Sequence, residues 1–302
     1  TLFRSVDIAV EETPDFIHLD LTLSAGDNCC RVVVKGTHTN VVELYINGQP
    51  QPLSEKQNTR TQRETLPTFS LQQAYDFINR VDFNDIRFIL DAARLNSALA
   101  AEGKTKKYGL NINGTFSDAV KNGLMSNDLL SKVIINTVAA SDARMGGAPV
   151  VAMSNFGSGN QGITATMPVV VVAEHLGVDE ETLARALSLS HLTAISIHSR
   201  YTRLSALCAA STAAMGAAAG MAWLFTRDIN TINTAIINMI SDITGMICDG
   251  ASNSCAMKVS SVVSSAFKAV LMAMQNSCAG ANDGIVCADV EQTINNLCRL
   301  VI

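Results

Sequence analysis

Long runs of basic residues are missing from this sequence. The densest basic segment spans residues 104–107, and the 302-residue chain has a formal net charge of −5 at pH 7. Nucleic-acid surfaces are built from clustered Lys and Arg, so this pattern argues against such a partner and favours small molecules. The chain is 48% hydrophobic, which is enough to bury a sizeable core in one large or two moderate domains.

Two common cysteine and histidine signatures are also missing. The eight cysteines are not spaced like those of a small secreted disulfide scaffold, and no secretory signal begins at Thr1. No Cys-x-x-Cys or His-Glu-x-x-His pattern occurs, which argues against zinc-ribbon, ferredoxin and helix-borne zinc sites. The sequence therefore predicts a protein of the reducing cytoplasm.

Charge is absent from residues 204–225, where Gly216 and Gly220 form the small-xxx-small pattern of packed membrane helices. The segment consists mostly of Ala and Gly interrupted by Ser and Thr, so it partitions weakly into lipid. We expect a core helix and no membrane span. Such helices can pack against a second copy as easily as within one chain, which leaves a homo-oligomer open.

Strand-like alternation occupies the first part of the chain, within residues 16–23, 30–35 and 41–48. The polar segment 49–67 has no periodicity and indicates a linker. From Ser70, which can cap a helix, apolar residues recur at helical spacing. Further helices are predicted over 84–101, 126–140, 163–176, 179–196, 203–225, 229–247, 254–275 and 288–300. The predicted fold class is α+β, a small antiparallel sheet followed by a larger all-helical domain.

This change of pattern divides the chain. Residues 1–67 are expected to be part of an α/β domain with antiparallel strands and a linker, and residues 68–302 form a helical domain. The sequence opens in a strand-like pattern with no initiator Met, so we expect further residues upstream.

Two polar, Gly-rich segments, residues 141–148 and 154–162, lie among apolar helices. Such segments can cradle a carboxylate or phosphate with main-chain N–H groups, and Arg144 could clamp a carboxylate with two hydrogen bonds. Tight interhelical turns explain the glycines equally well. Residues 157–162 also match the dinucleotide fingerprint, but helical patterns flank them on both sides, which argues against a nucleotide.

Two histidines, His191 and His198, stand seven residues apart and therefore on one face of a helix. Without a nearby carboxylate motif they are more typical of core or capping residues than of metal ligands. His198 precedes the turn before the helix that contains Cys208, which makes it the better acid–base candidate.

Three cysteines could belong to one cofactor site. Cys248 is predicted to follow the end of one helix and Cys255 to lie at the start of the next, where the positive N-terminal end stabilises a thiolate. Cys208 stands forty positions upstream in a Gly/Ala-rich stretch. Iron–sulfur clusters use thiolate ligands, but buried free thiols also fit this pattern.

Four motifs in the same order closely resemble the YhaM-like proteins, bacterial L-cysteine desulfidases similar to the alpha chain of iron–sulfur L-serine dehydratase. The motifs are residues 141–148, 158–170, 204–210 and 245–260, and the likeness extends over residues 1–302. The resemblance implies a serine-dehydratase-alpha-like helical domain and a 4Fe-4S enzyme that works without pyridoxal phosphate. Such an enzyme removes the β-substituent of an L-amino acid and releases pyruvate and ammonia, with sulfide as the third product from cysteine.

Motif by motif, the resemblance implies that Cys208 and Cys248 are cluster ligands. Cys255 corresponds approximately to a further cysteine of the serine dehydratases, with different spacing. The first ligand of the desulfidases lies in a Gly-Cys-Thr-Glu-Pro motif near the family's N-terminus, which this sequence lacks. We therefore expect this chain to correspond to the C-terminal two-thirds of such a protein. The cofactor that the resemblance implies is a 4Fe-4S cluster, which this chain holds only if the ligands that remain are sufficient.

The chemistry needs a base for the Cα proton, a group that orients the carboxylate, and a Lewis acid for the leaving group. Arg144 is the predicted carboxylate ligand, and His198 or Lys258 the predicted base. The other predicted substrate-binding residues are Ser158, Gly159, Asn160, Gln161 and Gly162. Three interpretations stay open: a cysteine desulfidase, a serine dehydratase on the same scaffold, and a non-catalytic amino-acid-binding or structural protein that has lost its cluster.

Overall fold

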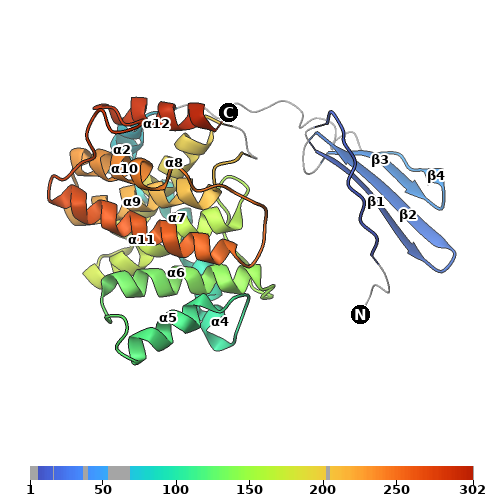
Figure 1. Cartoon of the computed structure of the whole chain (residues 1–302), viewed down its shortest axis with the longest axis horizontal. Coiled ribbons are helices and arrows are strands. Elements are labelled where there is room, and N and C mark those ends of the chain that lie inside the picture. The colour runs from blue at the N-terminus through green and yellow to red at the C-terminus, as the bar shows by residue number, and fades with distance from the viewer. Residues whose placement is uncertain (1–5, 16, 37–39, 54–68, 202–204, 302) are drawn as a thin grey trace. The chain divides into compact units, whose positions relative to one another are not determined.

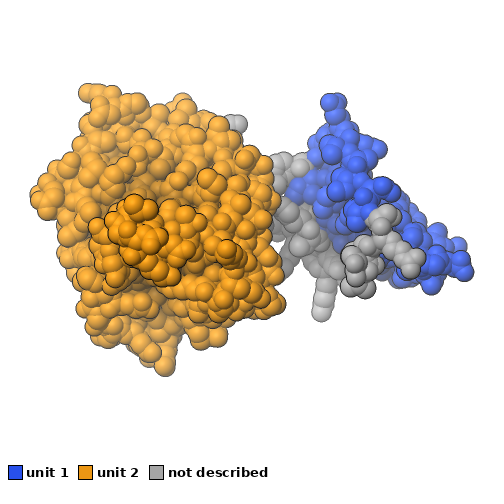
Figure 2. All heavy atoms as spheres, turned by 60° about the horizontal axis from the view of Figure 1, so that its bottom comes forward, with its two compact units in different colours: residues 1–66 blue, residues 67–302 orange. Residues whose placement is uncertain are grey.

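The chain forms two compact units, Thr1–Leu66 and Pro67–Ile302 (Figures 1 and 2). The computed structural model describes residues 6–15, 17–36, 40–53, 69–201 and 205–301.

The first unit contains a four-stranded antiparallel sheet in the order β1-β2-β3-β4 (Figure 1). Its strands are β1 His18–Ala25, β2 Asn28–Lys35, β3 Val41–Ile46 and β4 Gln49–Pro50. The predicted antiparallel sheet is confirmed, but the expected linker starts too early because β4 was missed. Asn47 and Gly48 have positive φ angles of 51° and 78°, so they form a tight hairpin turn that returns the chain along β3.

The second unit consists of helices, as the fold class predicted (Figure 1). Its helices are α2 Leu71–Arg80, α3 Phe83–Ile86, η2 Arg87–Ile89, α4 Leu90–Thr105, α5 Ile112–Lys121, α6 Leu129–Met145, α7 Gly159–Leu176, α8 Glu180–His198, α9 Ala209–Thr226, α10 Ile229–Ile243, α11 Cys255–Met274 and α12 Val290–Leu300. Polar side chains start several of them: Ser70, Asp128, Ser158, Asp179, Asp228 and Asp289 each accept a main-chain N–H bond in the first turn.

Several helix boundaries differ from the predicted ones; for example, α6 ends at Met145, beyond the expected residue 140, and α7 begins at Gly159, before the expected residue 163. The expected helix 84–101 is interrupted by the 3₁₀ turn η2. The expected helices 203–225 and 229–247 are too long, because the residues between α10 and α11 pair with the residues before α9 in an isolated antiparallel bridge. Hydrogen bonding between distant segments competes there with helix formation, and local periodicity does not report it.

Small residues allow the helices to approach closely in the core. α9 contacts α7, α8, α10 and α11, and its Ala side chains are almost entirely buried. A Cβ atom at Gly216 would collide with the main-chain oxygen of Ser190 on α8, and one at Gly220 would lie 2.8 Å from Val169 Cγ2 on α7. The uncharged stretch that resembles a membrane segment therefore serves close helix packing.

One helix in the described part of the chain, α11, is long and apolar enough to cross a membrane. Half of its apolar window is buried, against α6, α9 and α10. Length and composition of this kind are also typical of a core helix.

The last helix is tied to the first one of this unit. Glu291 on α12 accepts a hydrogen bond of 2.7 Å from the main-chain N–H of Leu71 at the start of α2. Its other carboxylate oxygen pairs with Arg200, which follows α8, at 2.6 Å. A single, largely buried carboxylate thus connects α2, α12 and the turn after α8.

Candidate active site

Two cysteines that are forty residues apart in the sequence meet at a short antiparallel bridge between Leu207 and Ile247. The N–H of Cys208 donates to Met246 O at 3.1 Å, and the N–H of Cys248 donates to Ala206 O at 2.8 Å. Cys208 therefore faces Met246, and Cys248 stands two residues further along the opposite segment.

This register places the two side chains on the same face as diagonal neighbours. Diagonal Cα atoms in an antiparallel pair are about 7–8 Å apart, which is longer than the roughly 4.4–6.8 Å of a disulfide. Both cysteines are free thiols. Their spacing fits two ligands of one bulky group better than a bond to each other.

The environments of the two thiols differ. Cys208 is buried at the start of α9, and burial raises its thiol pKa, an effect that the N–H groups of Ala210 and Ser211 oppose. Cys248 is exposed. The positive end of α9 would favour a thiolate at Cys208 as soon as a cation or metal compensates for the burial.

Lys258 on α11 belongs to the same neighbourhood. Its ammonium group pairs with Asp249 and donates to Ile247 O at 3.0 Å. Asp249, and to a smaller extent the Cys208 and Cys248 thiols, raise the pKa of Lys258. The side chain is therefore a fixed positive charge beside the two thiols.

Cys255 begins α11 and faces other partners. Its sulfur accepts from Ser252 N at 3.5 Å and donates to Gly250 O at 3.6 Å. Electrostatically its neighbour is Arg144. No group of three or more His, Cys, Asp or Glu side chains suited to a metal ion occurs among the described residues. The structure thus brings Cys208 and Cys248 together but does not complete a three-ligand group with Cys255.

Arg144, near the end of α6, is a half-buried cation without a carboxylate partner among the described residues. Burial lowers the pKa of its guanidinium group. Its Nη1 donates to Met145 Sδ at 3.0 Å. A Cβ atom at Gly159, the first residue of α7, would collide with the guanidinium group. A desolvated guanidinium against a helix N-terminus is a suitable place for a carboxylate.

The predicted Gly-rich loops turn out to be helix ends. Ser158 caps α7 by accepting from Gln161 N at 3.3 Å, so Gly159 to Gly162 form the first turn of the helix. Asn160 accepts from Ser141 Oγ at 3.2 Å, which joins α6 to α7. A Cβ atom at Gly162 would collide with the main-chain oxygen of Met153, so this glycine is needed for close packing.

Asp142 organises the neighbouring segment and was not foreseen from the sequence. Its buried carboxylate accepts from the main chain and the side-chain amide of Asn113 at 2.9 and 3.0 Å, at the start of α5. Burial raises the pKa of this carboxyl group. The helix α5 itself was also missed, because its anchor is this long-range contact and not a local pattern.

His198, the last residue of α8, is buried and sandwiched between two rings. Its ring centroid lies 4.4 Å from that of Phe156 and 4.7 Å from that of Tyr201, and both pairs are stacked. Its Nδ1 atom is 2.8 Å from Gln161 Oε1. Tyr201 is within electrostatic range of Cys208, so the imidazole stands one ring away from the thiol neighbourhood.

His191 lies seven residues earlier in the same helix and is also buried. Its Nδ1 is 3.0 Å from Asn155 Nδ2, and its Nε2 is 3.0 Å from Thr166 Oγ1. Burial lowers its pKa to about 4, so the ring is neutral at pH 7. Asn155, Thr166 and Tyr201 were not among the predicted site residues, although polar residues in so apolar a context are a signal that could have found them.

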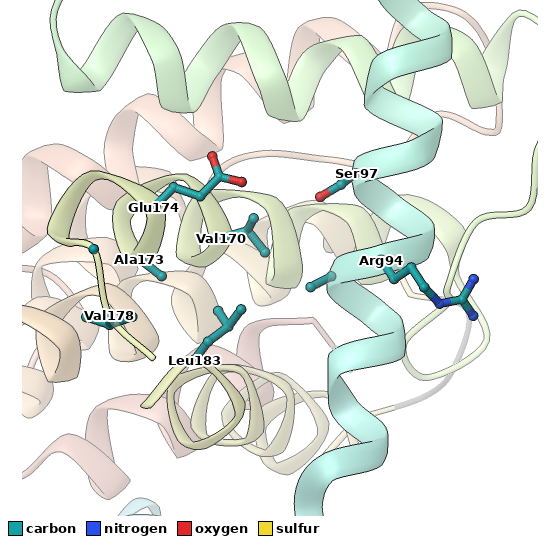
Figure 3. A pocket seen from close by; sticks show the side chains of 9 residues that line it. Arg94, Ser97, Val170, Ala173, Glu174, Val178 and Leu183 are labelled. Carbon is teal, nitrogen blue, oxygen red and sulfur yellow. The ribbon is translucent and has the colours of Figure 1, made fainter. Parts of the chain in front are cut away.

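A surface pocket lies elsewhere, between α4, α7 and the start of α8 (Figure 3). Its volume is about 310 Å³, and Val170, Ala173 and Leu183 form much of its apolar wall. In Figure 3 the guanidinium group of Arg94 points away from these side chains. None of the predicted site residues lines this pocket, so it adds nothing to the thiol neighbourhood.

Comparison with known proteins shows the family of this chain. The family model described as "Serine dehydratase alpha chain" matches residues 40–301. This chain belongs to that family. It is also 52% identical over 295 residues to the "UPF0597 protein YhaM" of Salmonella typhimurium and of Salmonella typhi, covering 96% of this chain and 67% of each relative. The resemblance to YhaM-like proteins is thereby confirmed, and membership of the serine dehydratase alpha chain family relates the chain to lyase-type enzymes.

Proposed function

We propose that the protein is a carbon–sulfur lyase that eliminates the β-substituent of L-cysteine and forms sulfide, ammonia and pyruvate. Family membership supports the reaction class. The observation that carries the proposal is the Leu207–Ile247 bridge, which sets Cys208 and Cys248 on one face beside Lys258. Such a pair suits a group that activates a leaving sulfur.

The cofactor that we propose is a 4Fe-4S cluster. Cys208 and Cys248 would hold it, since their diagonal spacing suits two ligands of a bulky group. When bound, a cluster with an iron that lacks a protein thiolate supplies a Lewis acid for the leaving group. Cys255, which faces Arg144, is the weaker ligand candidate.

Binding of the substrate carboxylate falls to Arg144. Its guanidinium group lacks an ionic partner among the described residues and abuts Gly159, where the first N–H groups of α7 are located. The Ser158 hydroxyl, which caps this helix, stands at the same end. Two hydrogen bonds from the guanidinium group would fix the orientation of the Cα–H bond.

Removal of the Cα proton falls to His198. Lys258, the other predicted base, is bound to Asp249, which raises its pKa, so it stays protonated and suits electrostatic support. His198 is held by stacking and by Gln161. An imidazole held in a fixed orientation is a suitable base for proton abstraction near neutral pH.

A serine dehydratase is the second candidate, because the family model that matches is named for that enzyme. Cysteine and serine differ by a single atom, and the described site contains no feature that selects sulfur over oxygen. The third interpretation, a non-catalytic protein without a cluster, predicts no turnover of either amino acid.

The test is anaerobic reconstitution of the protein with iron and sulfide, followed by visible absorption spectroscopy and assays of pyruvate from L-cysteine and L-serine. We expect a cluster band, and pyruvate with equimolar sulfide from L-cysteine. Pyruvate from L-serine alone would refute the cysteine desulfidase and support the serine dehydratase. Absence of both the band and pyruvate would refute the two enzymatic candidates.

Variants locate the site in the same assay. Cys208→Ala and Cys248→Ala should each remove the cluster band, whereas Cys278→Ala, at an exposed cysteine after α11, should keep it.

Arg144→Lys keeps the positive charge but removes the planar guanidinium group that can form two parallel hydrogen bonds to a carboxylate. The KM should therefore rise about tenfold to a hundredfold. The matched control is Arg94→Lys, at an exposed arginine that pairs with Asp91. An unchanged KM for Arg144→Lys would refute the carboxylate assignment.

A further inference from the structure

A continuous line of buried side chains connects the two histidines of α8. From the inner end it runs from Thr166 through His191, Asn155 and Gln161 to His198. The successive distances are 3.0, 3.0, 2.9 and 2.8 Å. All five residues are at most 6% exposed, and none of them is an acid or a permanently charged base. Each link must therefore combine one donor with one acceptor, so the direction of one bond fixes the next.

Main-chain groups set the direction at the inner end. The amide of Asn96 is oriented by the main-chain N–H of Met153, which donates to Asn96 Oδ1 at 3.0 Å. Asn96 Nδ2 is consequently the atom that faces Thr166 Oγ1, at 3.2 Å. The Thr166 hydroxyl donates its only proton to Gly162 O at 2.7 Å. It can then only accept from His191, so His191 carries its proton on Nε2.

The main-chain carbonyl group of His191 sets the same direction of hydrogen bonding in the middle of the chain, at Asn155. Asn155 Nδ2 lies 3.4 Å from the carbonyl oxygen of His191, in addition to its contact with His191 Nδ1. A carbonyl oxygen accepts hydrogen bonds and never donates them, so this corner of the Asn155 amide must be its NH₂ group. His191 Nδ1 is thus an acceptor, which agrees with a proton on Nε2.

From these two anchors the remaining links follow. With Asn155 Nδ2 turned toward His191, Asn155 Oδ1 accepts from Gln161 Nε2. Gln161 Oε1 then faces His198 Nδ1 and can only accept. We propose that this buried amide chain holds His198 as the Nδ1–H tautomer, with its lone pair on Nε2, and that Asn155, Gln161 and His191 are positioning residues for it. The two histidines therefore hold opposite tautomers.

Gln161 thus has a positioning role, whereas the sequence predicts that it binds substrate. Both ends of its amide are used inside the chain, and its side chain is 0% exposed. Its meaning for catalysis rests on the proposed function, in which His198 takes the Cα proton. The stacking of Phe156 and Tyr201 on the imidazole fixes the ring plane, and the amide chain fixes which nitrogen is basic.

The direct test reads the tautomers by NMR. The protein is labelled with ¹⁵N-histidine, and long-range ¹H–¹⁵N correlations at neutral pH distinguish the protonated from the unprotonated ring nitrogen. His198→Gln and His191→Gln assign the two rings by the loss of their signals. We expect Nδ1–H for His198 and Nε2–H for His191. Nε2–H at His198, or the same tautomer in both rings, would overturn the proposal.

Two variants of Gln161 test the connection. Gln161→Met removes the acceptor with little change of volume, so His198 should shift toward the Nε2–H form while His191 keeps its tautomer. Gln161→Glu still offers an acceptor and should preserve Nδ1–H at His198. An unchanged His198 tautomer in Gln161→Met would show that the amide chain does not control it. The native His191 signals in the same spectrum report that the variant is folded.

Kinetics complete the test if the protein is active. Gln161→Met should lower kcat by about 10-fold to 100-fold with little change in KM, and Gln161→Glu should restore most of it. A raised KM with unchanged kcat would instead make Gln161 a substrate ligand and overturn the positioning role. An inactive wild-type protein would refute the proposed function but not the tautomer, which the NMR experiment decides alone.

Discussion

The two sides of the candidate site are built in opposite ways. On one side, the side chains from His191 to His198 are buried and hydrogen-bonded to one another in a continuous chain. On the other side, Cys248 is exposed and the Asp249 side chain is 70% exposed, and the segment around them is held by one main-chain bridge and the Lys258–Asp249 pair. One side is preorganised by folding, whereas the other offers charges and thiols to an incoming group.

This contrast separates two demands of an elimination reaction. A base must keep one orientation through every turnover, which a closed network of amides achieves. A site for a cofactor must admit it after folding, which requires accessible ligands. The difference leads to three predictions, each of which affects one side more than the other.

The largest expected effect is on folding stability. Asn155→Leu removes the centre of the buried chain and leaves partners on His191 and Gln161 unsatisfied, so the free energy of unfolding should fall by about 3 kcal/mol. Asp249→Asn, on the exposed side, should leave the free energy of unfolding unchanged, because exposed ion pairs contribute little. Urea denaturation followed by circular dichroism measures both. An equal loss of unfolding free energy in the two variants would contradict the difference between the buried and the exposed side.

A second effect is the pH dependence of stability. Burial lowers the pKa of His191 to about 4, below the value of roughly 6.5 in an unfolded chain. The unfolded state therefore binds the proton first, and stability is lost as the pH falls from about 6.5 toward about 4. Between about pH 7.5 and about pH 5 the loss from this one group is about 2 kcal/mol.

Urea denaturation at the two pH values checks this expectation, with His191→Gln as the variant that lacks the titrating group. The wild-type protein should lose more stability than His191→Gln over this interval. His175→Gln, at an exposed position after the core of α7, is the matched control and should behave like the wild type. The same pH dependence in all three proteins would mean that His191 is not the responsible group.

The smallest effect is on thiol reactivity. In protein without a cluster, Cys248 should react with iodoacetamide roughly tenfold faster than Cys208, because Cys248 is exposed and burial raises the pKa of Cys208. Cys298, 4% exposed and with a pKa raised to about 11 by burial, should be slowest. Peptide mass spectrometry after timed alkylation gives the order. Faster alkylation of Cys208 than of Cys248 would contradict the assigned environments.

Local patterns predicted the class of each region but not the way in which distant segments meet. Alternation gave the strands, and spacing and caps such as Ser70 gave most helices. The bridge at Leu207 could not be predicted from local patterns, because it depends on a partner forty residues away. The start of α5 depends on Asp142, which is likewise distant in sequence.

The candidate site was predictable to a similar extent. The sequence indicated Cys208, Cys248, Arg144 and His198, and resemblance to a family supplied the chemistry that spacing alone left open. Asn155 was noticed only as part of the polar segment 154–162, because an Asn near glycines is typical of a turn. Its role follows only from the carbonyl group of His191, and a one-dimensional pattern contains no such contact.

The carboxylate of Glu291 has a consequence for how the molecule is made. It joins Leu71 to α12 across 220 residues of sequence and also holds Arg200. During synthesis from the N-terminus, the earlier helices emerge from the ribosome well before this carboxylate exists. The contacts of Glu291 with the start of α2 and with the turn after α8 can therefore form only after α12 has been synthesised.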